Sequence, residues 1–120
     1  MERLNVGVIG LRMGEAHLKG YEACPDANVV AVCDIDEDRL EEILENREGV
    51  TGYVEYAEML QREDLHAVSI ALPNYLHAPV TIEALGNGTH VLCEKPMAMN
   101  ASEAERMKRT AAEADLTLML

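Results

Sequence analysis

Short apolar runs rich in β-branched residues recur along the chain, and segments with helical spacing separate them. The apolar runs, each expected to form a strand, cover Leu4–Ile9, Asn28–Cys33, Thr51–Val54, His66–Leu72, His90–Cys93 and Leu116–Leu120. The segments between them, each expected to form a helix, cover Gly14–Ala23, Glu37–Asn46, Tyr56–Gln61, Leu76–Leu85 and Ala101–Ala114. This alternation constrains the fold most strongly, because it is the pattern of parallel strands joined by crossover helices.

The apolar residues within these runs are continuous rather than alternating, as in Val6–Ile9 and Ala67–Leu72. Strands read this way when helices cover both faces of a parallel sheet. We therefore predict an α/β fold, a Rossmann-type doubly wound parallel sheet of six strands in the order 3-2-1-4-5-6 with helices on both faces. A chain of 120 residues has room for one core, so one domain over residues 1–120 is expected.

Charge and cysteine usage exclude several classes of partner. With 10 Lys and Arg against 22 Asp and Glu, the formal net charge of −12 repels nucleic acid and anionic membranes. No apolar run approaches the roughly 18 residues that a membrane helix needs, and no leader pattern precedes the first strand. The cysteines and histidines lack the spacing of a disulfide framework or a metal site. We predict a cytoplasmic protein without a metal.

The first predicted strand-to-helix turn reads Gly10-Leu11-Arg12-Met13-Gly14. Gly10 permits the tight turn and Gly14 lets the helix begin close to the strand, so that free N–H groups and the positive helix end face a pyrophosphate. The spacing is one residue shorter than the usual G-x-G-x-x-G pattern, and Arg12 stands where the middle glycine is missing. Arg12 can either crowd the pyrophosphate or donate to a phosphate oxygen, and both readings stay open.

Asp34 ends the second predicted strand, close to the spacing of about 20 residues at which an acidic side chain binds the adenosine ribose. Its carboxylate would accept hydrogen bonds from the ribose hydroxyls, and Asp34 with Asp36 would repel a 2′-phosphate. The sequence thus predicts NAD in preference to NADP. The alternative is that Asp34 only caps the helix beginning near Asp36. We expect the side chain of Arg39 to lie over the adenine of the bound cofactor.

Two further turns follow the fourth and fifth predicted strands, and they read Leu72-Pro73-Asn74-Tyr75-Leu76-His77 and Cys93-Glu94-Lys95-Pro96. In this order they resemble the glucose-fructose oxidoreductase / inositol dehydrogenase / rhizopine catabolism (Gfo/Idh/MocA) family, whose first domain has a Pro-Asn-x-x-His turn and a Glu-Lys-Pro signature. The two motifs disfavour a methyltransferase, which shares only the glycine-rich turn and the acidic residue. The resemblance implies the NAD-binding domain of an oxidoreductase that transfers hydride between nicotinamide and a hydroxyl-bearing carbon of a sugar or polyol.

The resemblance also implies residue roles. Glu94 would reach the nicotinamide ribose, and Lys95 would be catalytic, next to the substrate hydroxyl. Hydride leaves a carbinol carbon only as that hydroxyl loses its proton, so a proton-transfer group is required there. Pro96 would follow a cis peptide bond. The turn after the fourth strand would border the nicotinamide through Leu72, Pro73 and Asn74, while His77 caps the next helix or serves only as a structural histidine.

Family members continue into a second domain that binds the substrate and usually forms the oligomer interface, whereas this sequence ends at Leu120 in the sixth predicted strand. We expect a truncated or excised domain that binds NAD without turnover, with an exposed apolar surface that favours a homo-oligomer. Two alternatives stay open: a stand-alone NAD-binding sensor or partner module, and a degenerate, non-binding relative with a structural role. The substrate and the direction of reaction cannot be read from this half.

Overall fold

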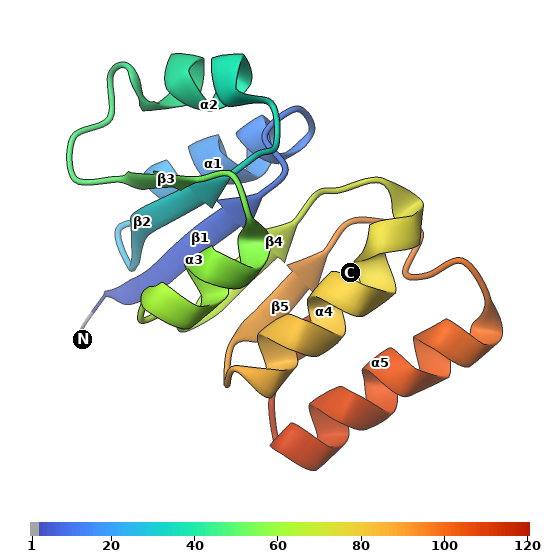
Figure 1. The fold of residues 1–120 in the computed structure, drawn as a ribbon. Helices are drawn as coiled ribbons and strands as arrows, with labels where there is room; N and C mark the ends of the chain where they lie inside the picture. The colour runs from blue at the N-terminus through green and yellow to red at the C-terminus, as the bar shows by residue number, and fades with distance from the viewer. Residues whose placement is uncertain (1–2) are drawn as a thin grey trace.

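Parallel strands alternate with helices along residues 3–120, which are the residues that the computed structural model describes (Figure 1). The six strands form one sheet in the order β3-β2-β1-β4-β5-β6, and every neighbouring pair is parallel. The predicted fold is therefore confirmed. In chain order the elements are β1 (Leu4–Ile9), α1 (Gly14–Glu22), β2 (Ala27–Cys33), α2 (Glu37–Leu44), β3 (Thr51–Tyr53), α3 (Tyr56–Arg62), β4 (Ala67–Ile70), a 3-10 turn (Asn74–Leu76), α4 (His77–Gly86), β5 (His90–Cys93), α5 (Ala101–Ala114) and β6 (Leu118–Met119).

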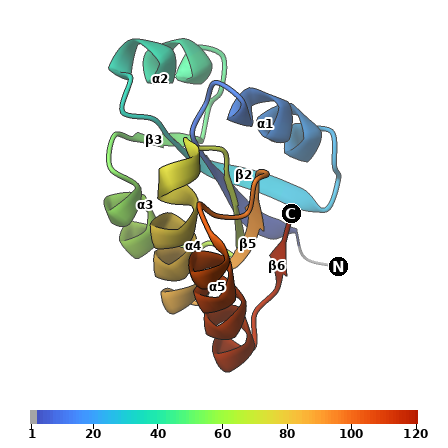
Figure 2. The same ribbon diagram turned by 90° about the vertical axis from the view of Figure 1, so that its right-hand side faces the viewer.

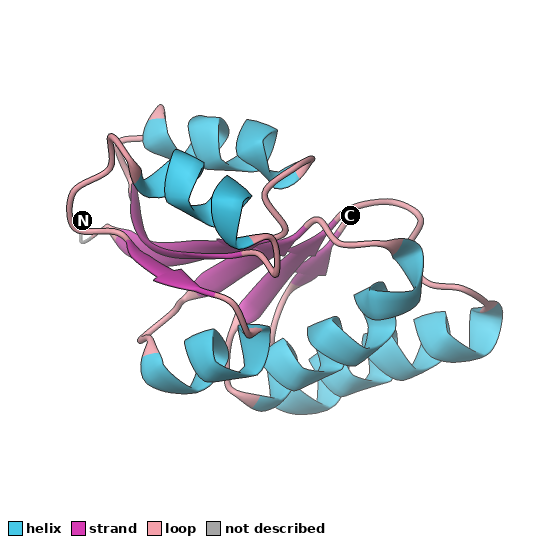
Figure 3. Ribbon diagram, turned by 45° about the horizontal axis from the view of Figure 1, so that its top comes forward, coloured by secondary structure: helices cyan, strands magenta, loops and turns pink. Residues whose placement is uncertain are grey.

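Helices cover the sheet from two sides, as Figure 3 shows. On one face Val8 and Val32 pack against Leu18 of α1 and Ile43 of α2. On the other face a larger cluster joins the opposite sides of the same strands to α3, α4 and α5, and Met107 of α5 is completely buried in it. Because successive side chains of a strand point to opposite faces, two cores account for the continuous apolar runs in the sequence.

The ends of the elements differ from the predicted ones by at most two residues, and the largest differences fall on α2, β4 and β6. The run His66–Leu72 predicts a longer fourth strand than the observed Ala67–Ile70. Ile70 pairs with Ile9, the last residue of β1, and the chain turns away at Gly10. The N–H of Ala71 makes the last hydrogen bond to β1, at the backbone oxygen of Ile9, and the residues after it form the loop that begins the candidate site.

The last strand lies at the edge of the sheet, away from β3 (Figure 2). Met119 and Leu120 expose about 60% of their surface there, at 59% and 61%. An exposed apolar surface was expected from the sequence, and this edge is one. That the surface forms a homo-oligomer stays a prediction. Within the described part of the chain, no helix combines the length and apolar character needed to cross a membrane.

Candidate functional site

The glycine turn between β1 and α1 requires glycine at Gly10. Its φ of +91° lies in the region that side chains avoid, and a Cβ there would lie 2.3 Å from the backbone oxygen of Ala71. Gly14 is required for a different reason, since a Cβ there would lie 2.8 Å from Cγ1 of Val8 and push α1 off the sheet. The turn thus brings backbone close to backbone at the carboxyl ends of β1 and β4, as a dinucleotide site needs.

Asp34 follows β2, and backbone amides hold both of its carboxylate oxygens. Oδ2 accepts from the N–H of Leu11, and Oδ1 accepts from the N–H of Asp36, both at 2.9 Å. Helix α2 is capped by Asp36, whose side chain accepts from the N–H of Arg39. The capping alternative for Asp34 is therefore wrong. Each carboxylate oxygen has a second lone pair, so Asp34 can still accept from a ligand.

A pocket of about 550 Å³ opens at the carboxyl ends of the strands, and we call it the strand-end pocket. Eight of the predicted site residues line it, namely Gly10, Leu11, Arg12, Met13, Asp34, Leu72, Pro73 and Asn74. The sequence prediction missed the apolar and aromatic side chains of its walls, Ile35, Val54, Tyr56 and Tyr75. Ile35 is 86% exposed. The signal that the sequence offers is an apolar residue directly after Asp34, which by itself does not distinguish a pocket wall from an exposed surface residue.

Arg12 and Arg39 take different positions beside the pocket. Arg12 is exposed, with its guanidinium 3.5 Å from the Asp36 carboxylate. Arg39 donates from Nε and Nη2 to the backbone oxygen of Leu11, and from Nη2 to Glu15 at 3.0 Å. The Arg39 bond is the main reason that the pKa of Glu15 is lowered. Arg39 thus links α2 to the glycine turn, and its place over the adenine stays a prediction.

His77 joins the two motif-bearing loops. Its ring is buried, with Nδ1 2.6 Å from the backbone oxygen of Pro96 and Nε2 2.7 Å from that of Leu72. Leu76 occupies the N-cap position of α4, so the helix-capping role implied for His77 is wrong. The buried ring is placed as a structural histidine would be, and its part in cofactor binding stays a prediction. The two ring nitrogens contact backbone oxygens of the loops and not the free N–H groups at the start of α4.

Glu94 and Lys95 follow β5, one strand farther from the glycine turn. The N–H of Glu94 donates to the backbone oxygen of Ile70, and its carboxylate lies 3.2 Å from Nε2 of His17. Lys95 is exposed, and the peptide bond between Lys95 and Pro96 is cis, as expected. Six predicted site residues thus lie beside the strand-end pocket rather than in its lining, namely Gly14, Arg39, His77, Glu94, Lys95 and Pro96.

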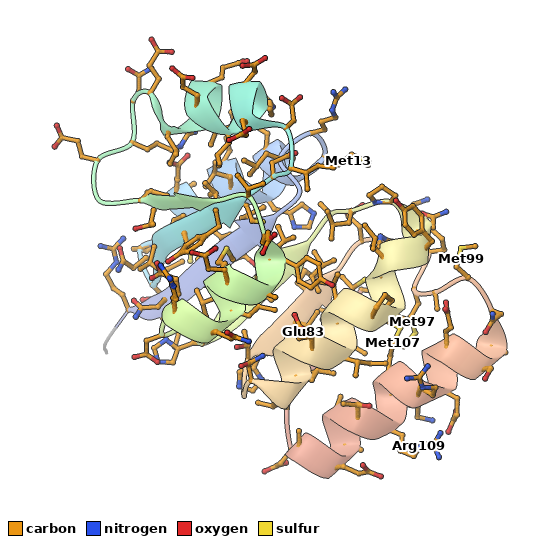
Figure 4. All side chains as sticks on the ribbon, viewed as in Figure 1. Met13, Glu83, Met97, Met99, Met107 and Arg109 are labelled. Carbon is orange, nitrogen blue, oxygen red and sulfur yellow. The ribbon has the colours of Figure 1, made fainter. Side chains whose placement is uncertain are left out.

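Methionines occupy both the site and the core. Figure 4 shows Met13 at the glycine turn and Met107 between α4 and α5. Met13 exposes 67% of its surface at the mouth of the strand-end pocket, while Met107 is fully buried. Met107 therefore fills the core, and Met13 is free to contact a ligand.

The strand-end pocket has the shape and chemistry that a dinucleotide requires. Its walls are largely apolar, and the glycine turn, where the backbone segments of β1 and β4 approach closely, forms one edge. The carboxylate of Asp34 keeps free lone pairs for hydroxyl donors. The volume of about 550 Å³ falls within the usual range for small-molecule sites. These residues therefore fit the adenosine half of such a cofactor.

Comparison with known sequences agrees with this geometry. Residues 4–120 match the model of an oxidoreductase family described as having an NAD-binding Rossmann fold. The chain is 40% identical over 106 residues to inositol 2-dehydrogenase of Renibacterium salmoninarum, covering 87% of this chain and 32% of that protein. It is 31% identical over 116 residues to myo-inositol 2-dehydrogenase of Thermotoga maritima, covering 96% and 35%. The chain therefore spans about a third of the length of these relatives.

Solved structures have the same arrangement of strands and helices. A probable dehydrogenase from Thermotoga maritima superposes with a TM-score of 0.91 at 32% identity, over 96% of this chain and 35% of that one. A 3-ketoreductase from Actinomadura kijaniata, in complex with TDP-benzene and NADP, gives 0.88 at 36% identity, over 98% and 38%. The WlbA dehydrogenase of Chromobacterium violaceum, in complex with NADH and UDP-GlcNAcA, gives 0.89 at 28% identity, over 98% and 34%.

Proposed function

We propose, from the premise that the chain belongs to the Gfo/Idh/MocA family of NAD-binding oxidoreductases, that residues 1–120 are a cofactor domain that prefers NAD to NADP. The observation behind this proposal is the carboxylate of Asp34. Backbone amides of Leu11 and Asp36 fix it at the rim of the strand-end pocket. A carboxylate held in this way presents acceptors to two ribose hydroxyls and repels a phosphate on the same ribose.

Similar proteins do not decide the choice between the two dinucleotides, because one structural neighbour holds NADP and another holds NADH. The preference proposed here depends on Asp34 together with Asp36. Arg12 lines the strand-end pocket, and its guanidinium is already 3.5 Å from the carboxylate of Asp36. A 2′-phosphate would therefore face two carboxylates and a cation whose charge is partly compensated.

We assign the nicotinamide half to the loops after β4 and β5. Leu72, Pro73 and Asn74 line the edge of the strand-end pocket nearest β5 in the sheet order. Nicotinamide, when bound, supplies the hydride acceptor or donor. In this proposal Glu94 accepts from the nicotinamide ribose, and Lys95 exchanges a proton with the substrate oxygen.

For the longer protein we propose a dehydrogenase of inositol, sugar or related polyol substrates, as the names of the relatives suggest. Substrate contacts and turnover would require a second domain, so the chain alone would bind the dinucleotide without turning over. A cytoplasmic location and a homo-oligomer belong to the same proposal. The free thiols of Cys24, Cys33 and Cys93 support the location, because reducing compartments maintain thiols.

Calorimetric titration with NAD⁺ and, separately, with NADP⁺ tests the cofactor proposal. We expect saturable binding of NAD⁺ and at least about tenfold weaker binding of NADP⁺. Asp34→Asn replaces a charged acceptor by a neutral amide, a loss of about 1.5–3 kcal/mol in total, so NAD⁺ affinity should fall by roughly 10- to 100-fold. Glu41→Gln is the matched control, because it removes one exposed carboxylate from α2 away from the pocket lining.

Two results would contradict the proposal. Equal affinity of the native chain for NAD⁺ and NADP⁺ would remove the assigned preference. Absence of binding at millimolar concentration of either dinucleotide would favour the degenerate relative, in which Arg12 blocks the glycine turn.

A further inference from the structure

A row of hydrogen-bonded side chains links helix α1 to the acidic residue after β5. The hydroxyl of Tyr21 lies 2.6 Å from Oγ of Ser69, and that Oγ lies 3.0 Å from Nδ1 of His17. Nε2 of His17 lies 3.2 Å from Oε1 of Glu94. The functional proposal uses Glu94 and leaves the other three without a role. We call these four residues the α1 polar row.

The centre of the α1 polar row is buried. Ser69 is fully buried on β4, between β1 and β5, while its neighbours Val68 and Ile70 point into the opposite core. His17 and Tyr21 are one helical turn apart and so share a face of α1. Burying a hydroxyl is costly unless it is hydrogen-bonded, and Ser69 is bonded on both sides. The row is therefore a built arrangement and not a chance surface contact.

With the His17 ring neutral and Glu94 ionised, only one set of directions satisfies every bond in the row. An ionised carboxylate accepts only, so Nε2 of His17 must hold the proton that it donates to Glu94. Nδ1 of a neutral imidazole then accepts, and the hydroxyl of Ser69 must donate to it. The Ser69 oxygen is left to accept from Tyr21. The partners thus select one tautomer and one orientation of the His17 ring.

We propose that His17 is a positioning residue for Glu94, and that Ser69 and Tyr21 hold His17 in the tautomer that this role requires. The proposal rests on the functional assignment of Glu94 to the nicotinamide ribose. His17 takes one carboxylate oxygen and leaves the other free to accept from a ribose hydroxyl. A free glutamate would lose side-chain entropy when it bound the ribose, whereas one held by His17 has already lost it.

Affinities for NAD⁺ and for ADP, measured by calorimetry on the native chain and its variants, separate this role from a structural one. ADP occupies the adenosine half and ends before the nicotinamide ribose, so it does not sense Glu94. We expect His17→Ala to weaken NAD⁺ binding by roughly three- to tenfold and to leave ADP binding unchanged. His17→Gln should restore most of the NAD⁺ affinity, because its amide can donate to Glu94. Tyr21→Phe, which leaves the Ser69 to His17 bond intact, should have the smallest effect.

A double-mutant comparison tests the coupling directly. If His17 acts through Glu94, then His17→Ala in a Glu94→Ala background should cost little further NAD⁺ affinity. Equal losses of NAD⁺ and ADP affinity in His17→Ala, no rescue by His17→Gln, or additive losses in the double variant would each overturn the positioning role while leaving the cofactor proposal intact. A native chain that binds ADP but not NAD⁺, or neither, would overturn both.

Discussion

Two strands of the sheet end in the same pair of residue types, a buried cysteine followed by an acidic residue, yet the two acids are held in different ways. Cys33 precedes Asp34 at the end of β2, and Cys93 precedes Glu94 at the end of β5. Backbone amides hold Asp34, whereas the side chain of His17 holds Glu94. In the proposed site, the fold itself would therefore position the adenosine half, and side chains would position the nicotinamide half.

This difference has a physical consequence for how each half responds to mutation. A bond from a backbone amide persists when the side chain of the donor residue changes. A bond from a side chain is lost with that side chain, and the α1 polar row depends on three of them. Single substitutions should therefore tune the nicotinamide half, while the adenosine half should change mainly when Asp34 itself or the backbone of the glycine turn is altered.

Gly10→Ala should cause the largest loss of stability, because it distorts the backbone of the glycine turn, which holds Asp34. The left-handed φ costs a side chain about 1–2 kcal/mol, and the 2.3 Å approach to Ala71 adds a backbone shift of about 1–3 kcal/mol. Urea denaturation should show a loss of unfolding free energy of about 2–5 kcal/mol. Gly49→Ala is the control, because φ is +80° there but no atom lies within 4 Å. Equal losses of unfolding free energy in Gly10→Ala and Gly49→Ala would contradict a special role for the backbone at Gly10.

His77→Ala should have the next largest effect, because the ring joins the loops after β4 and β5. Its removal leaves a cavity and takes away the hydrogen bond that a ring N–H donates to the backbone oxygen of Leu72 or Pro96, at a cost of about 2–4 kcal/mol in thermal or urea unfolding. His90→Ala is the control, since His90 is exposed and only its Nδ1 accepts a bond, from the N–H of Thr117. A loss no larger than that of the control would show that this link does not stabilise the fold.

The smallest effect is expected in the thiol reactivity of the two buried cysteines, Cys33 and Cys93. It tests whether the ends of β2 and β5 are equally buried. Burial, followed by the charge of Asp34, raises the pKa of Cys33 to about 12, and burial also raises the pKa of Cys93. A raised pKa keeps the thiol protonated, so both should react slowly with a thiol reagent at pH 8–9 while exposed Cys24 reacts fast. Cys24→Ser should remove the fast phase. A second fast-reacting thiol in the native chain would contradict the predicted burial of one strand end.

The raised pKa of Cys33 also makes the stability of the fold depend on pH. Because the folded pKa of Cys33 lies above its ordinary value of 9.0, the stability that comes from keeping the thiol neutral is present below pH 9. It is lost as the pH rises through about 12. Stability measured from pH 8 to 11 should therefore fall less steeply in a Cys33→Ala variant.

The sequence predicted the elements and their order because periodicity depends only on local spacing. It also located Gly10, Asp34 and the loop from Leu72 to Asn74, since each follows a strand and the carboxyl ends of parallel strands share one edge. Ile35 and Tyr75 were missed even though they are next to predicted site residues. No pattern marks an apolar residue after a strand as a pocket wall rather than a surface residue.

Side-chain partners were harder to predict than positions. His17 and Glu94 meet because α1 packs against β1, β2 and β4, and β4 is the neighbour of the strand that Glu94 follows. His77 was expected to cap a helix, but its ring lies between the backbone oxygens of Leu72 and Pro96. Spacing in the sequence shows which residues share an edge, whereas the hydrogen bonds among them follow from the three-dimensional register.

The most direct test of the account is the change in backbone amide resonances of the ¹⁵N-labelled chain on titration with NAD⁺. We predict that the amides of Leu11 and Asp36, which hold Asp34, shift together with those of the loop from Leu72 to Asn74 and of Glu94. ADP should shift only the first group, because it reaches only the adenosine half. Shifts confined to other surfaces, such as α5 and β6, or no shifts at millimolar NAD⁺, would contradict a dinucleotide site at the carboxyl ends of the strands.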